Sequence, residues 1–152
     1  MFFSTLKGRA KRFAKKSIIA AVIIIQLLGS AKSSLAAWSH HSKECIKQAN
    51  IACEKWQRYE KEVKKGDAGA RIDVVKYEME TLIYLEKLYF SLMKDAKSSI
   101  KDKKYDDAIK ELEASKRYAE IVLKVTKGDN KWERNTNFNL EQINKLIKNI
   151  QK

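Results

Sequence analysis

The sequence predicts an all-α protein, an antiparallel (up-down) bundle of about four helices that follows an N-terminal signal peptide or single-pass anchor. Three observations lead to this prediction: no proline in 152 residues, helical spacing of apolar residues after residue 37, and an apolar run behind a basic N-terminus. At ordinary frequencies a chain of this length contains about seven prolines, so their absence favours long helices over β-structure with many turns. The hydrophobic content of 44% is typical of a globular chain.

Residues 1–36 have the order of features that is typical of an export signal. They hold seven basic residues and no acidic residue, and six of the seven precede the apolar run 17–28. Small residues follow at 29–37, so we expect a signal peptide cleaved before Ala37. The alternative is an uncleaved single-pass anchor, although a membrane span needs about 20 apolar residues and this run is shorter. Both interpretations place the helical domain, residues 37–152, outside the cytoplasm, either in the periplasm or secreted.

The formal net charge of +13 is unevenly distributed along the chain. Residues 37–152 hold 25 of the 32 basic residues and all 19 acidic residues, which leaves a formal charge of +6. The two signs alternate, and this is typical of solvated helix faces, whereas a nucleic-acid surface needs a patch of one sign. We therefore expect no nucleic-acid partner. A cytosolic protein that binds nucleic acid through its basic N-terminal arm is kept as the second alternative.

Four segments after residue 37 carry the apolar spacing of an amphipathic helix. The first covers residues 38–63, where small or apolar residues recur in steps of four and three up to a loop at 66–69. The second, at about 71–100, is the most apolar, and so wide a stripe indicates a helix buried on more than one side. That stripe consists of Ile72, Val75, Met79, Leu82, Leu85, Leu88, Tyr89, Leu92, Met93, Ala96 and Ile100.

A change of phase and a capping signal predict the remaining two helices. Tyr105 lies five residues after Ile100, about 140° out of phase with the second stripe, so residues 101–104 are expected to form a turn. The third helix then continues to about Lys127. The last is expected to be short, with Asn139 as its N-cap. Short connections between such helices favour antiparallel neighbours.

Two cysteines, Cys45 and Cys53, lie in the first predicted helix. If the segment between them is helical, an eight-residue step separates their Cα atoms by about 12 Å, well beyond the roughly 7 Å that a disulfide allows. Three interpretations remain open. The cysteines are two small buried residues, or one of them forms a disulfide with a second chain in a homodimer, or an irregular start of the helix lets them pair.

His40 and His41, the only histidines, are weak candidates for a metal site together with Cys45, which lies one helical turn after His41. Two or three ligands are too few for a closed structural site, so we expect no metal or other cofactor, and a polar, frayed helix start. Catalysis has no support either. The histidines are adjacent, and the sequence has neither a nucleophile elbow nor a glycine-rich phosphate loop. We expect that the protein is not an enzyme.

Trp132 and Glu111 are the last residues that the sequence singles out. Trp132 lies among polar residues in a stretch, 128–137, that is expected to be a loop, where it either closes the end of the bundle or contacts a partner. Glu111 is expected on a solvated face beside lysines. The expected function is therefore binding: a small exported helical protein that recognises a protein partner or an anionic membrane or envelope surface, favoured by its positive charge.

Overall fold

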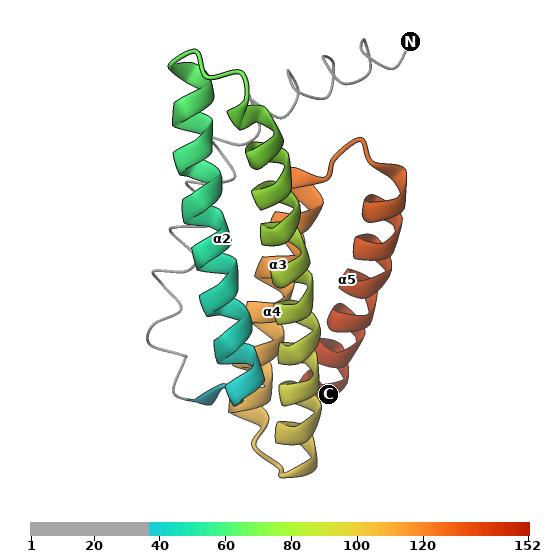
Figure 1. Cartoon of the computed structure of the whole chain (residues 1–152). Helices are drawn as coiled ribbons and strands as arrows, with labels where there is room; N and C mark the ends of the chain where they lie inside the picture. The colour runs from blue at the N-terminus through green and yellow to red at the C-terminus, as the bar shows by residue number, and fades with distance from the viewer. Residues whose placement is uncertain (1–36) are drawn as a thin grey trace.

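The computed structural model describes residues 37–152, so the predicted signal peptide or anchor at residues 1–36 lies outside the described part of the chain. Four helices make up this part: α2 (His40–Lys64), α3 (Ala70–Lys101), α4 (Tyr105–Val125) and α5 (Asn130–Gln151). No strand occurs among the described residues, and successive helices run in opposite directions (Figure 1). The predicted all-α bundle of four helices is confirmed.

Each helix packs mainly against its neighbours in the chain. α3 contacts α2 and α4, and α5 contacts α4. This arrangement confirms that the second predicted helix is buried on more than one side. The largest completely buried apolar side chains come from all four helices: Trp56, Tyr89, Leu85, Leu88, Leu92, Leu112, Ile143 and Val122.

The chain reverses direction at three residues with a positive φ angle. Gly66 (φ 103°) ends the turn after α2, and Gly128 (φ 98°) lies between α4 and α5. Lys103 (φ 61°) adopts the same left-handed region in the turn between α3 and α4, where the backbone N–H of Lys104 donates to the carbonyl of Ser99 at 2.8 Å. The predicted turn at residues 101–104 is therefore confirmed, and α3 and α4 do not form one rod.

The start of α2 is fixed to α3 by hydroxyl and carboxylate groups. Ser42 Oγ lies 2.6 Å from Ser91 Oγ and donates to Asp95 Oδ2 at 2.7 Å. The backbone N–H of Ser39, the N-cap of α2, donates to the same carboxylate oxygen at 3.2 Å. Trp38 is buried just before the helix, with its ring edge-on to that of Tyr118. The expectation of a frayed helix start is wrong, because polar groups at this end have partners across the bundle.

The last helix begins about ten residues earlier than the sequence predicted. α5 starts at Asn130, and its N-cap is Asp129, whose side chain accepts a hydrogen bond from the backbone N–H of Trp132 at 3.4 Å. Asn139 is therefore inside the helix and is not its N-cap. The first turns escaped prediction because Thr136, a polar residue, takes the buried position there.

Replacing Asp129 with alanine tests this start. Loss of an N-cap costs about 1 kcal/mol, so the free energy of unfolding of Asp129→Ala should fall by that amount in urea titrations followed by circular dichroism. Asn137→Ala, at an exposed position inside α5, is the matched control and should be neutral or slightly stabilising. An Asp129→Ala variant as stable as the control would instead support a helix that starts near residue 139.

Candidate docking surface

The histidines and Cys45 do not assemble a metal site in the described chain. His41 Nε2 lies 3.7 Å from Cys45 Sγ, and both histidines are exposed on the first turn of α2. Within residues 37–152 no group of three or more His, Cys, Asp or Glu side chains is placed to hold a metal ion. The helix brings together the pair that the sequence suggested, and it adds no third ligand to that pair.

Both cysteines face the core of an unbroken helix. Cys45 and Cys53 are free, and they are 4% and 1% exposed. Because α2 is continuous from His40 to Lys64, the interpretation that an irregular start lets them pair is wrong. Their burial favours the interpretation of two small core residues. A disulfide between chains would require one thiol to leave the core, and it stays a prediction that this fold does not favour.

Burial also makes the two thiols unreactive. It raises the pKa of Cys45 above its ordinary value and that of Cys53 to about 12, so neither forms the nucleophilic thiolate near neutral pH. We expect a thiol reagent such as dithionitrobenzoate to leave the folded chain unlabelled and to react with two thiols after denaturation. Rapid labelling of the folded protein would show that α2 opens or packs differently.

Trp132 lies in the first turn of α5 and not in a loop. Its side chain is half-buried and packs against the hydrophobic core. This position favours the interpretation in which Trp132 closes the end of the bundle, while its contact with a partner stays a prediction.

Two carboxyl groups are buried in places that the sequence did not reveal. Glu78 of α3 is 3% exposed, and its Oε1 has no hydrogen-bond partner among the described residues. Burial, with a smaller contribution from Glu60, raises the pKa of Glu78 to about 8. The expectation that Glu111 is solvated is wrong, since it occupies the core-facing side of α4 one turn before buried Ser115. Burial raises its pKa to about 7, although Ser99 Oγ donates to both of its oxygens.

Glu78 and Glu111 are not hydrogen-bonded to each other. They lie on different helices, and within residues 37–152 the only side-chain hydrogen bonds to either group are those from Ser99 to Glu111. Among the described residues the cysteines are buried thiols with raised pKa values, and the histidines lie at the opposite end of α2 from Glu60, whose charge helps to raise the pKa of Glu78. The two buried carboxyl groups therefore favour a stability that depends on pH over a role in acid–base chemistry.

The unusual surface of the bundle is the outer face of α3. Of the residues expected in its buried stripe, Ile72, Val75 and Met79 are 78%, 54% and 44% exposed, so this part of the expectation is wrong. Ile83 and Phe90 of the same helix are 40% and 44% exposed. At about 100° per residue, four of these side chains, all except Val75, fall within an arc of about 40°, and they extend for about 27 Å along the helix. We call these five residues the α3 stripe.

Lysines border the α3 stripe on the side that leads to α2. Lys76, Lys87 and Lys94 are exposed at about 40–60° from the centre of the stripe. Two of them are held near aromatic rings: Lys76 Nζ lies 5.3 Å from the centre of the Tyr77 ring, and Lys87 Nζ lies 5.3 Å from that of Tyr84. The lysine stems thus extend the apolar surface while their ammonium groups remain in water.

Basic residues also continue the α3 stripe at its far end, whereas the nearest acid is partly shielded. Exposed Lys97 and Lys101 follow Phe90 on the same face of α3. Glu86, next to the stripe on its other side, is half-buried, and burial raises its pKa above the ordinary value. The outer face of α3 is therefore both apolar and positively charged.

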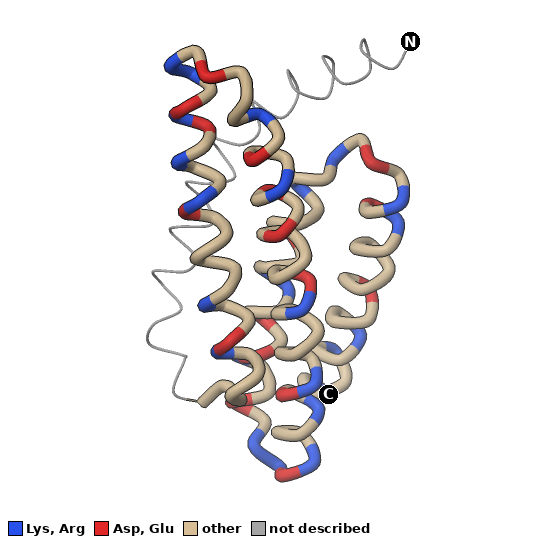
Figure 2. Tube along the Cα trace, in the orientation of Figure 1, with Lys and Arg blue, Asp and Glu red and all other residues tan. Residues whose placement is uncertain are grey.

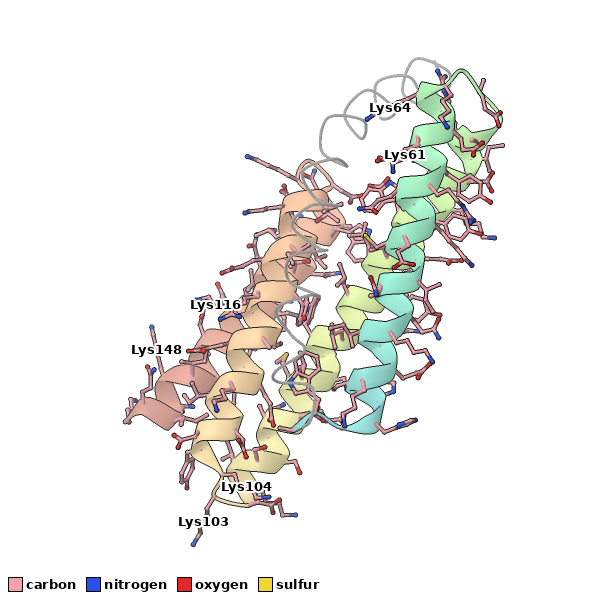
Figure 3. The ribbon with its side chains drawn as sticks, turned by 90° about the vertical axis from the view of Figure 1, so that its left-hand side faces the viewer. Lys61, Lys64, Lys103, Lys104, Lys116 and Lys148 are labelled. Carbon is pink, nitrogen blue, oxygen red and sulfur yellow. The ribbon has the colours of Figure 1, made fainter. Side chains whose placement is uncertain are left out.

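Over the described bundle as a whole the charges are mixed. Figure 2 shows basic and acidic residues interspersed along all four helices. Lys61 and Lys64 lie at one end of the bundle, and Lys103 and Lys104 extend from the α3–α4 turn at the opposite end (Figure 3). The six labelled lysines, which include Lys116 of α4 and Lys148 of α5, therefore do not converge on a single patch.

Comparisons with protein-family models, with curated proteins and with solved structures found no match to this chain. None of the four described helices combines the length and the apolar character that crossing a membrane requires. The function is therefore inferred from the outer face of α3.

Proposed function

We propose that this protein is a non-enzymatic binding protein, exported from the cytoplasm, whose helical domain docks through the outer face of α3 onto an acidic partner. The observation that carries the proposal is the α3 stripe, five large apolar side chains that are 40–78% exposed on one helix. Scattered single apolar residues are normal on protein surfaces, but a continuous row indicates a surface that is covered during function.

Charge defines the class of partner. The exposed lysines beside the stripe favour an acidic protein or an anionic envelope surface, and salt should weaken the association. The proposal of export depends on the basic, apolar and small residues of the segment 1–36. A protein retained at the membrane by an uncleaved anchor would use the same surface, since its helical domain would lie on the same side.

Photochemical cross-linking in cells tests the docking surface directly. Benzoylphenylalanine introduced at Ile83 of the full chain should give adducts in irradiated cells, because this position lies within the stripe. The matched control is the same residue at Phe138, an exposed apolar position on α5, which is 61% exposed. Adducts at residue 138 that equal those at residue 83, or none at residue 83, would contradict docking through α3.

N-terminal sequencing of the protein purified from cells tests export and separates the two forms. A chain that begins at Ala37 supports a cleaved signal peptide. A membrane-bound chain that retains residues 1–36 supports the anchor. Full-length protein that is free in the cell interior would contradict both and would favour the nucleic-acid alternative.

A further inference from the structure

We propose that the partner of the α3 stripe is the surface of a bilayer that contains anionic phospholipids, on which α3 lies flat. This inference rests on the proposed function, because it names the partner of the same surface. It follows from the arrangement of the exposed residues along α3, from their charge, and from the distribution of the apolar side chains on a single helix.

The apolar side chains lie in a line on the outside of one cylinder. Ile72, Met79, Ile83 and Phe90 fall within about 40° of arc over about 27 Å, whereas helix-in-groove recognition requires two walls that enclose the bound segment. A straight apolar row on one helix can enter the boundary between headgroups and acyl chains to a depth of about 5–10 Å without any groove. This geometry favours a planar partner.

The lysines occupy the positions that such a surface requires. Lys76, Lys87 and Lys94 lie beside the row, and Lys97 and Lys101 continue it. A helix in the plane of a membrane interface typically has basic residues along the edge of its apolar face, where their ammonium groups reach anionic headgroups. Each lysine near an anionic membrane surface strengthens binding about fivefold.

The same charges count against a second copy of this chain as the occupant. Two α3 helices packed face to face and antiparallel would bring these lysines close to each other, and like charges across an interface oppose association. An acidic protein satisfies the charge requirement, but it would also have to supply the walls that α3 lacks. The bilayer surface is therefore the occupant that both charge and shape favour.

Co-sedimentation with vesicles tests the proposal. Vesicles of phosphatidylglycerol and phosphatidylcholine are compared with vesicles of phosphatidylcholine alone, using the full chain and a chain of residues 37–152. The shorter chain is used because residues 37–152 bury a core made of their own side chains, and its helicity is checked by circular dichroism. Each variant is compared with the unsubstituted chain of the same length, so any binding by residues 1–36 is common to both.

Two sets of substitutions are matched with controls on α5. Ile72→Gln, Met79→Gln and Ile83→Gln together replace three of the four residues of the row, and Phe138→Gln is the control at an exposed apolar position. Lys76→Gln, Lys87→Gln and Lys94→Gln together remove the flanking charge, and Lys131→Gln, Lys145→Gln and Lys148→Gln remove the same charge from α5. All these positions are exposed, so the variants should fold.

We expect the unsubstituted chain to bind the anionic vesicles and to bind phosphatidylcholine vesicles weakly. The apolar triple variant should bind about tenfold or more weakly, and the α3 lysine variant about 100-fold more weakly at low salt. Both α5 controls should bind the anionic vesicles with an affinity closer to that of the unsubstituted chain than the α3 variants do. Equal binding by the α3 and α5 variants, or no binding to anionic vesicles by either chain, would overturn the proposal.

The failure of this proposal is distinguishable from the failure of the proposed function. If vesicles are not bound while cross-linking at residue 83 gives protein adducts, the bilayer is the wrong partner and docking through α3 stands. If residue 83 gives no adducts of any kind, both proposals fall.

Discussion

Replacing Leu85 with alanine is expected to lower the free energy of unfolding by about 2–5 kcal/mol, the largest effect of any single change considered. Leu85 is 0% exposed in the middle of α3, where the helix packs between α2 and α4. The substitution removes buried methyl groups and leaves a cavity that surrounding helices fill only in part. Urea denaturation followed by far-ultraviolet circular dichroism measures the effect.

Ile83→Ala is the matched control for this substitution. Ile83 lies two residues away on the same helix and is 40% exposed, so its truncation should cost about 1 kcal/mol or less. A small cost would also show that this member of the α3 stripe is not retained for stability. If both variants lost the same stability, the outer face of α3 would be part of the folded core and not a free surface.

Replacing Glu78 with glutamine is expected to remove about half of a strong pH dependence of stability. Burial raises the pKa of Glu78 from its ordinary value of 4.5 to about 8. Between these two values the folded chain keeps the proton and the unfolded chain releases it, so stability is greatest in acid and falls as pH rises. Glu78 alone should therefore lower the free energy of unfolding by about 2–3 kcal/mol between pH 5 and pH 7.

Glutamine has no proton to release, so Glu78→Gln should flatten this slope and be more stable than the unsubstituted chain near pH 8. A smaller slope of the same sign should remain, because burial also raises the pKa of Glu111, to about 7. Glu120→Gln, at an exposed position on α4, is the control. A slope that is the same in the Glu78→Gln variant and in the unsubstituted chain would show that this carboxyl group is solvated.

The sequence was sufficient to predict the class of fold. Along most of the chain, the spacing of apolar residues and the positions of loop residues indicate the same helix boundaries. The stripe of the first helix, the phase change before Tyr105 and the glycines at 66 and 128 all coincide with features of the structure. The beginning of α5 was missed because its buried position holds Thr136 and its neighbour Phe138 is exposed, so no apolar period marks it.

The surface proposed for docking could not be predicted for a related physical reason. Hydropathy shows that α3 carries more apolar residues than its neighbours, but not that α2 and α4 cover only part of its circumference. Ile72 and Met79 therefore look like core residues until the packing is known. The burial of Glu78 and Glu111 was not predicted, for the opposite reason. A core is predicted from apolar residues at helical spacing, and a carboxylate at a core position contradicts that pattern.

Thiol accessibility in cells tests the central claim, that the outer face of α3 is covered when the protein is outside the cytoplasm. Cys45 and Cys53 are buried and should not react with a maleimide. Each of the variants Ile83→Cys and Phe138→Cys therefore adds a single reactive thiol. With a membrane-impermeant maleimide on intact cells or spheroplasts, we predict labelling at 138 and protection at 83, with position 83 labelled after extraction in high salt. Equal labelling of both positions, or labelling of neither until the cells are lysed, would contradict the account.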